Sequence, residues 1–218
     1  MVVAIDGPSG VGKSTVARAV AAALGVPYLD TGSYYRAATY LALRGAADPQ
    51  DEQAILEALE IAELTVVDGV LWLDGIDVGE SLRGPAVTAA VSIVAAHPAV
   101  RRQVVDLQRN WVDDQGGAVV VEGRDIGTVV FPEAAVKVFL IADAATRAER
   151  RSADLEASGT SVDQLRQEMD QRDAADSTRA TSPLRAADDA ETIDTSHMTI
   201  AQVVGKILDL VGTVAPSP

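Results

Sequence analysis

The sequence contains no cysteine in its 218 residues, so disulfide bonds are excluded. It lacks the charged start, short apolar stretch and cleavage site of a secretory leader, and it has no apolar run long enough to cross a bilayer. These absences predict a protein that is soluble, cytoplasmic and without a membrane partner. Hydrophobic residues make up 48% of the chain, which is enough for the packed core of one large domain.

Positive charge is also scarce. Against 32 aspartate and glutamate residues there are 18 lysine and arginine residues, and the formal net charge is −14. Surfaces that bind nucleic acid neutralise many phosphates with cations, so we expect no nucleic-acid polymer as a partner. Only Lys13, Lys137 and Lys206 are lysines. The positions of the arginines therefore carry most of the information about cationic sites.

The first lysine lies in a glycine-rich stretch that follows an apolar run at residues 2–5 and leads into a helical pattern. The stretch consists of Gly7, Pro8, Ser9, Gly10, Val11, Gly12, Lys13, Ser14 and Thr15. It matches the G-x-x-x-x-G-K-[ST] pattern of a P-loop, in which backbone N–H groups surround phosphates at a helix N-terminus. Lys13 would reach the β- and γ-phosphates of ATP, and Ser14 would ligate Mg²⁺. The alternative is a glycine-rich turn with an incidental lysine.

Strands and helices alternate along the chain, as βαβ units require. The predicted strands are residues 2–6, 28–29, 118–121, 136–141 and 191–194. The predicted helices are residues 14–24, 31–45, 51–59, 87–95, 100–112, 143–157, 162–175 and 200–211. This order predicts an α/β P-loop NTPase fold, in which helices flank a parallel five-stranded sheet. Thr31 or Ser33 would cap the second helix.

Residues 64–78 break this alternation. Three short strands, 64–67, 70–73 and 76–78, are separated by the Asp-Gly pairs at 68–69 and 74–75. Asp-Gly between β-rich runs is a strong hairpin signal. The pattern predicts a small antiparallel insert, which is too short to bury a core of its own and is expected beside the site of a second substrate.

A P-loop alone does not define the chemistry. A GTPase would need an N-K-x-D motif, which is missing, and motor or transport ATPases are longer. The strand at 118–121 continues into the polar loop 122–128, which contains Glu122, Arg124 and Asp125. An arginine and a carboxylate at the carboxyl edge of a parallel sheet suit recognition of a second, polar anionic substrate.

The helix at 143–157 carries Arg147, Arg150 and Arg151 on or near one face. These arginines could simply pair with neighbouring acids in solvent. Phosphoryl transfer offers a second interpretation, because it requires cations around the transferred group and the exclusion of water. The helix would then belong to an arginine-bearing lid.

Six ordered blocks together resemble the bacterial cytidylate kinases, a family of nucleoside monophosphate kinases. They are I-D-G-P-S-G-V-G-K-S at 5–14, D-T-G-S-Y-Y-R at 30–36, S-I-V-A-A-H-P-A-V-R at 92–101, E-G-R-D-I-G-T-V-V-F-P at 122–132, R-A-E-R-R at 147–151 and R-D-A-A-D-S-T-R at 172–179. The resemblance covers essentially the whole chain. It implies a core (about 1–30, 98–146 and 177–212), an acceptor-binding subdomain with the insert (about 31–97) and a lid (about 147–176). The tail at 213–218 is expected to be disordered.

The resemblance implies transfer of the γ-phosphoryl group of ATP to CMP or dCMP, with Mg²⁺ and without a covalent enzyme intermediate. The partners would be these small nucleotides, and we expect a monomer. The implied catalytic residues are Lys13, Arg124, Arg147, Arg151 and Arg179. The implied acceptor-binding residues are Thr31, Tyr35, Arg36, Ser92, Arg101, Arg124, Asp125, Arg172, Asp176 and Arg179. Of these, Ser92, Arg101 and Asp125 would recognise the cytosine edge.

Several alternatives stay open at this point. Thr31 could be a helix cap, Tyr35 a core residue, Ser92 a buried helix hydroxyl and Asp176 a cap or turn residue. Glu122 stands where the family often has Asp, so its role near Mg²⁺ is open. The acceptor could instead be UMP, AMP, dTMP or a sugar acid. A protein of another class, a regulator that binds ATP without turning it over, would need no arginine-lined second site.

Overall fold

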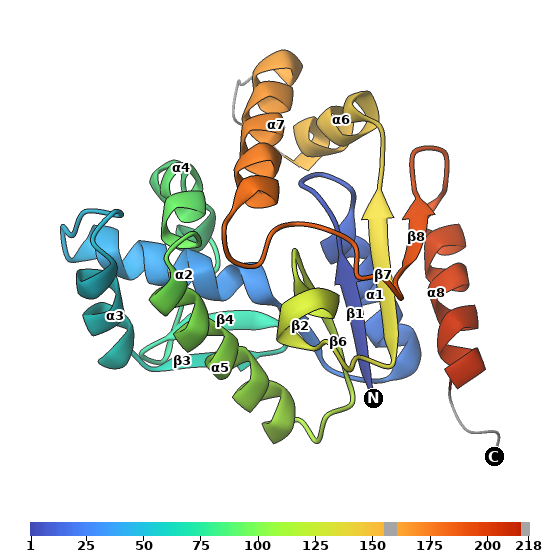
Figure 1. Cartoon of the computed structure of the whole chain (residues 1–218), viewed down its shortest axis with the longest axis horizontal. Coiled ribbons are helices and arrows are strands. Elements are labelled where there is room, and N and C mark those ends of the chain that lie inside the picture. The colour runs from blue at the N-terminus through green and yellow to red at the C-terminus, as the bar shows by residue number, and fades with distance from the viewer. Residues whose placement is uncertain (155–160, 215–218) are drawn as a thin grey trace. The chain divides into compact units, whose positions relative to one another are not determined.

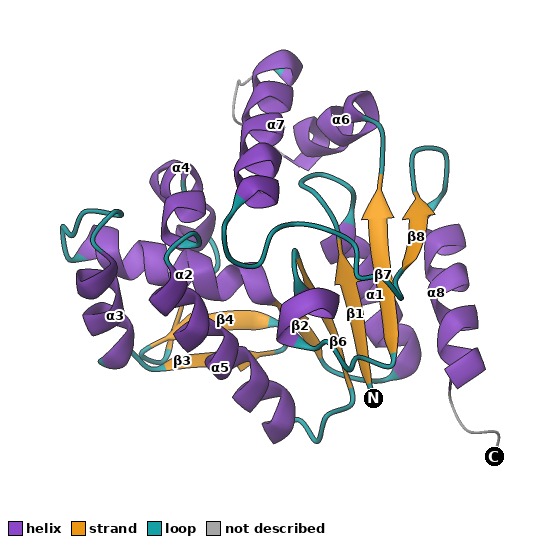
Figure 2. Ribbon diagram, viewed as in Figure 1, coloured by secondary structure: helices purple, strands orange, loops and turns teal. Residues whose placement is uncertain are grey.

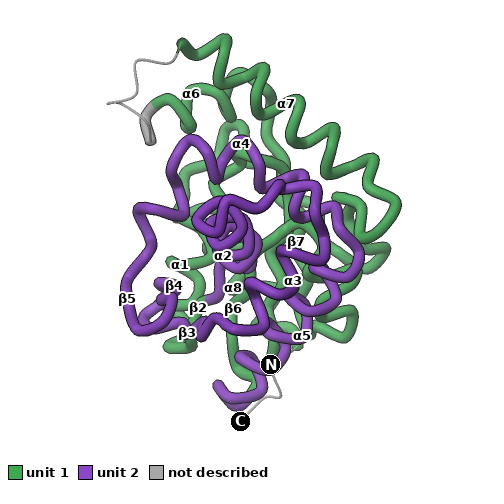
Figure 3. Tube along the Cα trace, turned by 90° about the vertical axis from the view of Figure 1, so that its left-hand side faces the viewer, with its two compact units in different colours: residues 1–28, 117–218 green, residues 29–116 purple. Residues whose placement is uncertain are grey.

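The computed structural model describes residues 1–154 and 161–214. Figure 1 shows the order of the elements along the chain. The fold divides into two compact units, drawn in different colours in Figure 3. Unit 1 comprises residues 1–28 and 117–218, and unit 2 comprises residues 29–116. The helix at 98–114, which the resemblance places with the core, groups with unit 2.

The central sheet has five strands in the order β2-β6-β1-β7-β8. Their bounds are β1 (Val2–Asp6), β2 (Tyr28–Asp30), β6 (Val119–Gly123), β7 (Val136–Ile141) and β8 (Glu191–Asp194). Strand β1 pairs in parallel with β6 and β7, and β7 pairs in parallel with β8. The interior of β1 and β6 is fully buried, as expected for a parallel sheet covered on both faces. The predicted α/β fold is confirmed.

Helices α1 (Lys13–Leu24) and α8 (Ile200–Val214) pack their apolar faces against this sheet (Figure 2). Helix α1 follows Gly12 directly and ends at Gly25, which adopts a left-handed conformation with φ 65°. Its N–H bonds back to the last turn of the helix, so Gly25 is the predicted C-terminal stop. The P-loop is thereby fixed between a buried strand and a packed helix.

Unit 1 also contains α6 (Ala144–Asp154) and α7 (Val162–Thr178). Helix α7 begins with a capping box, in which Ser161 and Gln164 satisfy each other's backbone N–H groups. The last residues of the helix predicted at 143–157 and the predicted break at 158–159 lie outside the described residues. A short π-helical turn, η2 (Ile126–Val130), follows β6.

Unit 2 holds the second sheet and its helices. The antiparallel order is β3-β4-β5, with β3 (Leu64–Val67), β4 (Val70–Leu73) and β5 (Ile76–Asp77). At both turns the Asp and the Gly have positive φ, between 50° and 76°, as the predicted hairpins require. The helical elements are α2 (Thr31–Arg44), α3 (Glu52–Glu60), the 3₁₀ turn η1 (Ser81–Arg83), α4 (Pro85–Val94) and α5 (Pro98–Asp114).

Two local predictions are wrong. Residues 122–128 are not a simple loop, because β6 extends to Gly123 and η2 begins at Ile126. The two carboxylate oxygens of Asp6 accept from the N–H groups of Ile126 and Gly127, at 2.9 and 2.8 Å, and so stabilise the turn. At α2, Asp30 is the N-cap residue and Thr31 is already helical, while Ser33 Oγ donates to the Asp30 carbonyl.

Within residues 1–154 and 161–214, no helix combines the length and the apolar character needed to span a membrane.

Candidate active site

The P-loop requires glycine at two positions. Gly7 has φ 150°, and a Cβ there would clash with the carbonyl of Leu140 on β7. Gly10 has φ 75°, and a Cβ there would clash with the Met169 methyl of α7 and the Arg147 carbonyl of α6. Only a residue without a side chain allows α6 and α7 to approach the loop this closely.

Lys13 is buried at the first position of α1, and its Nζ donates to the Pro8 carbonyl at 2.7 Å. Burial lowers the pKa of Lys13, and the nearby Arg124 lowers it further, whereas Glu122 and Asp173 act in the opposite direction. A bound phosphate would favour the charged ammonium, because it adds negative charge beside the buried amine.

Arg124 lies just after β6 and contacts the P-loop directly. Its guanidinium donates to the Gly7 carbonyl at 3.1 Å, to Ser9 Oγ at 2.9 Å and to Asp176 at 3.0 Å. Asp176 is buried in the last turn of α7, where Arg179 approaches its other oxygen at 3.6 Å. Asp176 is therefore neither a helix cap nor a turn residue, and it joins two of the predicted substrate-binding arginines.

The arginines of α6 contact the loop from the other side. Arg147 forms an ion pair with Asp173 of α7 and donates to the Ser9 carbonyl at 3.1 Å. Arg150 donates to the carbonyls of Val11 and Thr195, at 3.2 and 2.7 Å. Both arginines thus bind P-loop carbonyls, so they do more than pair with acids in solvent.

Arg172 and Arg151 complete this group of cations. Burial lowers the pKa of Arg172, and Arg124 and Arg151 lower it further, while Asp176 raises it. The Nε of Arg172 is buried and has no hydrogen-bond partner among the described residues. A guanidinium in this state is suited to an incoming anion.

Three carboxylates lie at the ends of β1 and β6. Glu122 is buried and accepts a hydrogen bond from the Tyr28 hydroxyl. Asp125 is buried directly before η2, and its carbonyl accepts from the N–H groups of Val129 and Val130. Burial raises the pKa of Asp6 to about 6, although its hydrogen bonds to the backbone of η2 act in the opposite direction.

The raised pKa of Asp6 predicts a pH dependence of stability. Between its ordinary value of 3.8 and about 6, the folded protein binds more protons than the unfolded chain, so this contribution to stability falls as the pH rises. We expect the free energy of unfolding of Asp6→Asn, relative to wild type, to rise by about 2 kcal/mol between pH 4 and pH 7. Urea unfolding of both proteins measures this difference, and parallel pH profiles would contradict it.

Unit 2 contains five of the predicted acceptor-binding residues. Thr31 is buried at the start of α2, and its carbonyl accepts from Gln108 Nε2 at 3.3 Å. Arg101 lies over the Tyr35 ring, 5.1 Å from its centroid, and donates to the Ala95 carbonyl at 3.1 Å. The structure therefore brings together Tyr35 and Arg101, which lie 66 positions apart in the sequence.

The remaining two of these residues in unit 2 are Arg36 and Ser92. Arg36 donates to the Leu82 carbonyl at 3.2 Å and to Thr88 Oγ1 at 3.3 Å. Ser92 is half-buried on α4. Whether the residues of the two units bind one substrate stays a prediction.

Two contacts to the P-loop come from residues that the sequence analysis did not name, Asp173 and Thr195. A third comes from Arg150, which it placed on the arginine face of the predicted lid helix but not among the catalytic residues. A signal existed for Asp173, because it lies four residues after Met169 and eight after Leu165, on the covered face of α7. Thr195 directly follows the predicted strand 191–194, at the carboxyl edge where ligands bind to such sheets.

Ser14 is the predicted protein ligand of Mg²⁺. Ser14 is exposed at the start of α1, next to Lys13. Among the described residues, no three His, Cys, Asp or Glu side chains are grouped so that they could hold a metal ion. A single hydroxyl fits an ion that arrives coordinated by the phosphates of the nucleotide.

The parallel sheet, the P-loop and the surrounding cations define a P-loop phosphotransferase. The chain matches the family described as Cytidylate kinase over residues 3–213. It is 50% identical over 217 residues to a cytidylate kinase of Mycobacterium avium (strain 104), which covers 97% of this chain and 95% of that protein. It is 49% identical to a cytidylate kinase of Rhodococcus opacus (strain B4), with 95% and 93% covered. The chain therefore belongs to the cytidylate kinase family of ATP-dependent nucleoside monophosphate kinases.

A solved structure from Thermus thermophilus superposes on the chain with a TM-score of 0.53 at 19% identity. The comparison covers 100% of this chain and 98% of the other. At this identity it supports the fold alone.

Proposed function

We propose that this protein transfers the γ-phosphoryl group of MgATP to CMP or dCMP and releases ADP with CDP or dCDP. The observation that carries the proposal is the pair of cations on the P-loop. Lys13 lies within the loop, and Arg124 donates to both Gly7 and Ser9 of the same loop. Transfer between two phosphates needs positive charge at this place, because both substrates are anions.

The reaction requires no general base, since the acceptor phosphate is already an anion. An oxygen of its 5′-phosphate attacks the γ-phosphorus in line, and the bond to the β,γ-bridging oxygen breaks, so that ADP leaves. Catalysis then consists of positioning, charge neutralisation and exclusion of water. We assign the first two tasks to Lys13, Arg124, Arg147, Arg151 and Arg179.

The donor's phosphates would be bound by the loop from Gly7 to Thr15, with Ser14 as the protein ligand of the Mg²⁺ that enters with ATP. The bound ion would add positive charge next to the reacting phosphates. Support for this assignment comes from the exposure of Ser14 in the first turn of α1, where a helix N-terminus favours anions.

For the acceptor, we assign Thr31, Tyr35 and Arg36, together with Arg124 and Arg179, to the 5′-phosphate. Arg172 and Asp176 are assigned to the sugar. Ser92, Arg101 and Asp125 would read the cytosine edge: the hydroxyl and the carboxylate accept from the exocyclic amine, and the guanidinium donates to ring acceptors. Uracil has a carbonyl in place of this amine, so acceptor would face acceptor.

We further propose a three-part organisation of core (about 1–30, 98–146 and 177–212), acceptor-binding subdomain (about 31–97) and lid (about 147–176). The protein is proposed to act as a cytoplasmic monomer on small nucleotides, without a nucleic-acid or membrane partner. Its net charge of −14 supports the exclusion of nucleic-acid polymers.

A coupled ADP-release assay with MgATP and CMP, dCMP, UMP, AMP or dTMP tests the proposed reaction. We expect turnover to be largely confined to CMP and dCMP. Preference for another monophosphate would retain the P-loop chemistry but contradict the assignment of the cytosine-reading residues. ATP binding without acceptor-dependent turnover would favour a regulator.

The cytosine assignment has a matched test in two adjacent arginines of α5. Arg101 is buried beside Tyr35, whereas Arg102 is exposed. We expect Arg101→Met to lower kcat/KM for CMP by about a hundredfold, because a lost charged hydrogen bond to a buried group costs 2–3 kcal/mol. The ratio of CMP to UMP turnover should fall with it. Arg102→Met should change neither quantity, and equal effects of the two substitutions would contradict the assignment.

A further inference from the structure

Ser9 of the P-loop is bound on three sides. Its N–H donates to Asp173 Oδ1 at 2.8 Å, its carbonyl accepts from Arg147 at 3.1 Å, and its hydroxyl accepts from Arg124 at 2.9 Å. Arg147 in turn forms an ion pair with the other oxygen of Asp173. Asp173 and Arg147 thus hold the N–H and the C=O of the same P-loop residue.

The covered face of α7 explains how Asp173 reaches this position. Leu165 and Met169 are buried on that face, and Asp173 and Asp176 follow at helical spacing. Met169 packs against Gly10, so the helix lies directly on the loop. The face is apolar in its first half and acidic where it meets Ser9 and the arginines.

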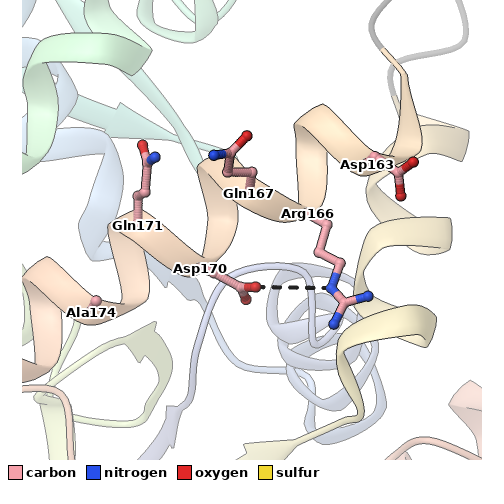
Figure 4. Close-up of a pocket in the computed structure, with 6 residues that line it drawn as sticks. All are labelled: Asp163, Arg166, Gln167, Asp170, Gln171 and Ala174. Carbon is pink, nitrogen blue, oxygen red and sulfur yellow. Dashed lines mark ion pairs between the residues drawn. The ribbon is translucent and has the colours of Figure 1, made fainter.

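Residues of α7 outside this face are more exposed. Figure 4 shows six of them around a depression, where Arg166 and Asp170 form an ion pair at 3.9 Å, and Asp170 also pairs with Arg147 of α6 at 3.1 Å. The residues that line the depression all belong to this one helix: Asp163, Arg166, Gln167, Asp170, Gln171 and Ala174. Asp170 is half-exposed, whereas the side chain of Asp173 is 14% exposed. Of these acids on α7, Asp173 is therefore the one turned toward the P-loop amide.

We propose that the Asp173 carboxylate is a built-in competitor of the nucleotide's phosphates for the P-loop. It holds the Ser9 N–H and Arg147, donors that belong to the same loop and cation group that would bind a triphosphate. This inference rests on the proposed function, namely that the P-loop binds ATP. Nucleotide binding then includes the exchange of one anion for another on these donors.

The exchange follows from charge and geometry. A carboxylate and a phosphate oxygen are both anionic acceptors. One N–H group or one edge of a guanidinium cannot donate full hydrogen bonds to both at once. A phosphate that enters beside an ionised Asp173 would also meet like-charge repulsion in a partly buried site. The apparent affinity for phosphate then equals the intrinsic affinity multiplied by the fraction of molecules in which Asp173 has released these donors.

The test is phosphate affinity in Asp173→Asn, measured by calorimetry with tripolyphosphate and with ATP, both without acceptor. Asparagine keeps the shape and an acceptor for Ser9 but removes the charge. We expect both ligands to bind about five- to tenfold more tightly than to wild type, within the usual range of such couplings. Asp163→Asn, which removes the same charge from an exposed position on α7, should leave both affinities unchanged.

Adenosine serves as the control ligand, because it carries no phosphate and its affinity should not change. Asp173→Ser provides a second variant, which removes the carboxylate with a smaller side chain and carries the test should the asparagine variant fail to fold. Unchanged or weaker phosphate affinity in a folded variant would overturn the inference while leaving the proposed function intact. A wild-type protein that binds neither tripolyphosphate nor ATP would overturn both.

Discussion

Replacing Lys13 with methionine is expected to lower kcat for phosphoryl transfer by about a thousandfold or more, with little loss of stability. Lys13 is the one lysine of the P-loop, and its ammonium lies beside Arg124, Glu122 and Asp173. Methionine keeps the buried stem but provides no charge for the developing negative charge of the transferred group. Because burial already disfavours the ammonium, its removal should not unfold the protein.

The coupled ADP-release assay measures the loss, and thermal unfolding of the same samples checks the fold. Lys206→Met is the matched control, since Lys206 is exposed on α8. A Lys13→Met protein with near-normal kcat would be incompatible with the P-loop assignment.

The second large effect is expected at Arg124. Arg124→Met should lower kcat/KM for CMP by about a hundred- to a thousandfold, because the guanidinium joins the P-loop to Asp176 through a fixed fork of donors. It would also leave Asp176 buried with one arginine fewer, so the free energy of unfolding should fall by about 1–3 kcal/mol.

Arg124→Lys separates charge from geometry. The ammonium keeps the positive charge but cannot reach Gly7, Ser9 and Asp176 together, so an intermediate kcat/KM is expected. Arg166→Met, at an exposed arginine of α7, controls for the loss of one positive charge. Wild-type kinetics in Arg124→Met would refute the assignment of this residue to the acceptor side.

The framework of the fold could be predicted from the sequence because its signals are local. The strands at 2–6, 136–141 and 191–194 have the predicted bounds, since each is a short run of strand-forming residues with a clear end. The signals for the two Asp-Gly turns and for the helix end at Gly25 are also local. These positions have positive φ, a backbone conformation that favours Gly and, in such turns, Asp.

What the sequence could not predict depends on residues far apart in the chain. The turn η2 is stabilised by a hydrogen bond from the Ile126 N–H to Asp6, which lies 120 positions earlier in the chain. No pattern of neighbouring residues predicts this hydrogen bond. The contact of Asp173 with Ser9 spans 164 positions, and it also requires that α7 lie on the loop. The sequence predicted the P-loop from its own motif, but the partners of that loop emerged only with the tertiary structure.

The two arginines that bind the P-loop from α6 differ in the permanence of their partners. Arg147 depends in part on Asp173, a side chain that another anion can replace. Arg150 donates to two main-chain carbonyls, Val11 and Thr195, which no ligand can remove from the backbone. Arg147 also donates to the main-chain carbonyl of Ser9. An anion that replaced Asp173 would therefore leave both arginines of α6 bound to main-chain carbonyls of the P-loop, and the helix would stay attached to the loop when a nucleotide enters.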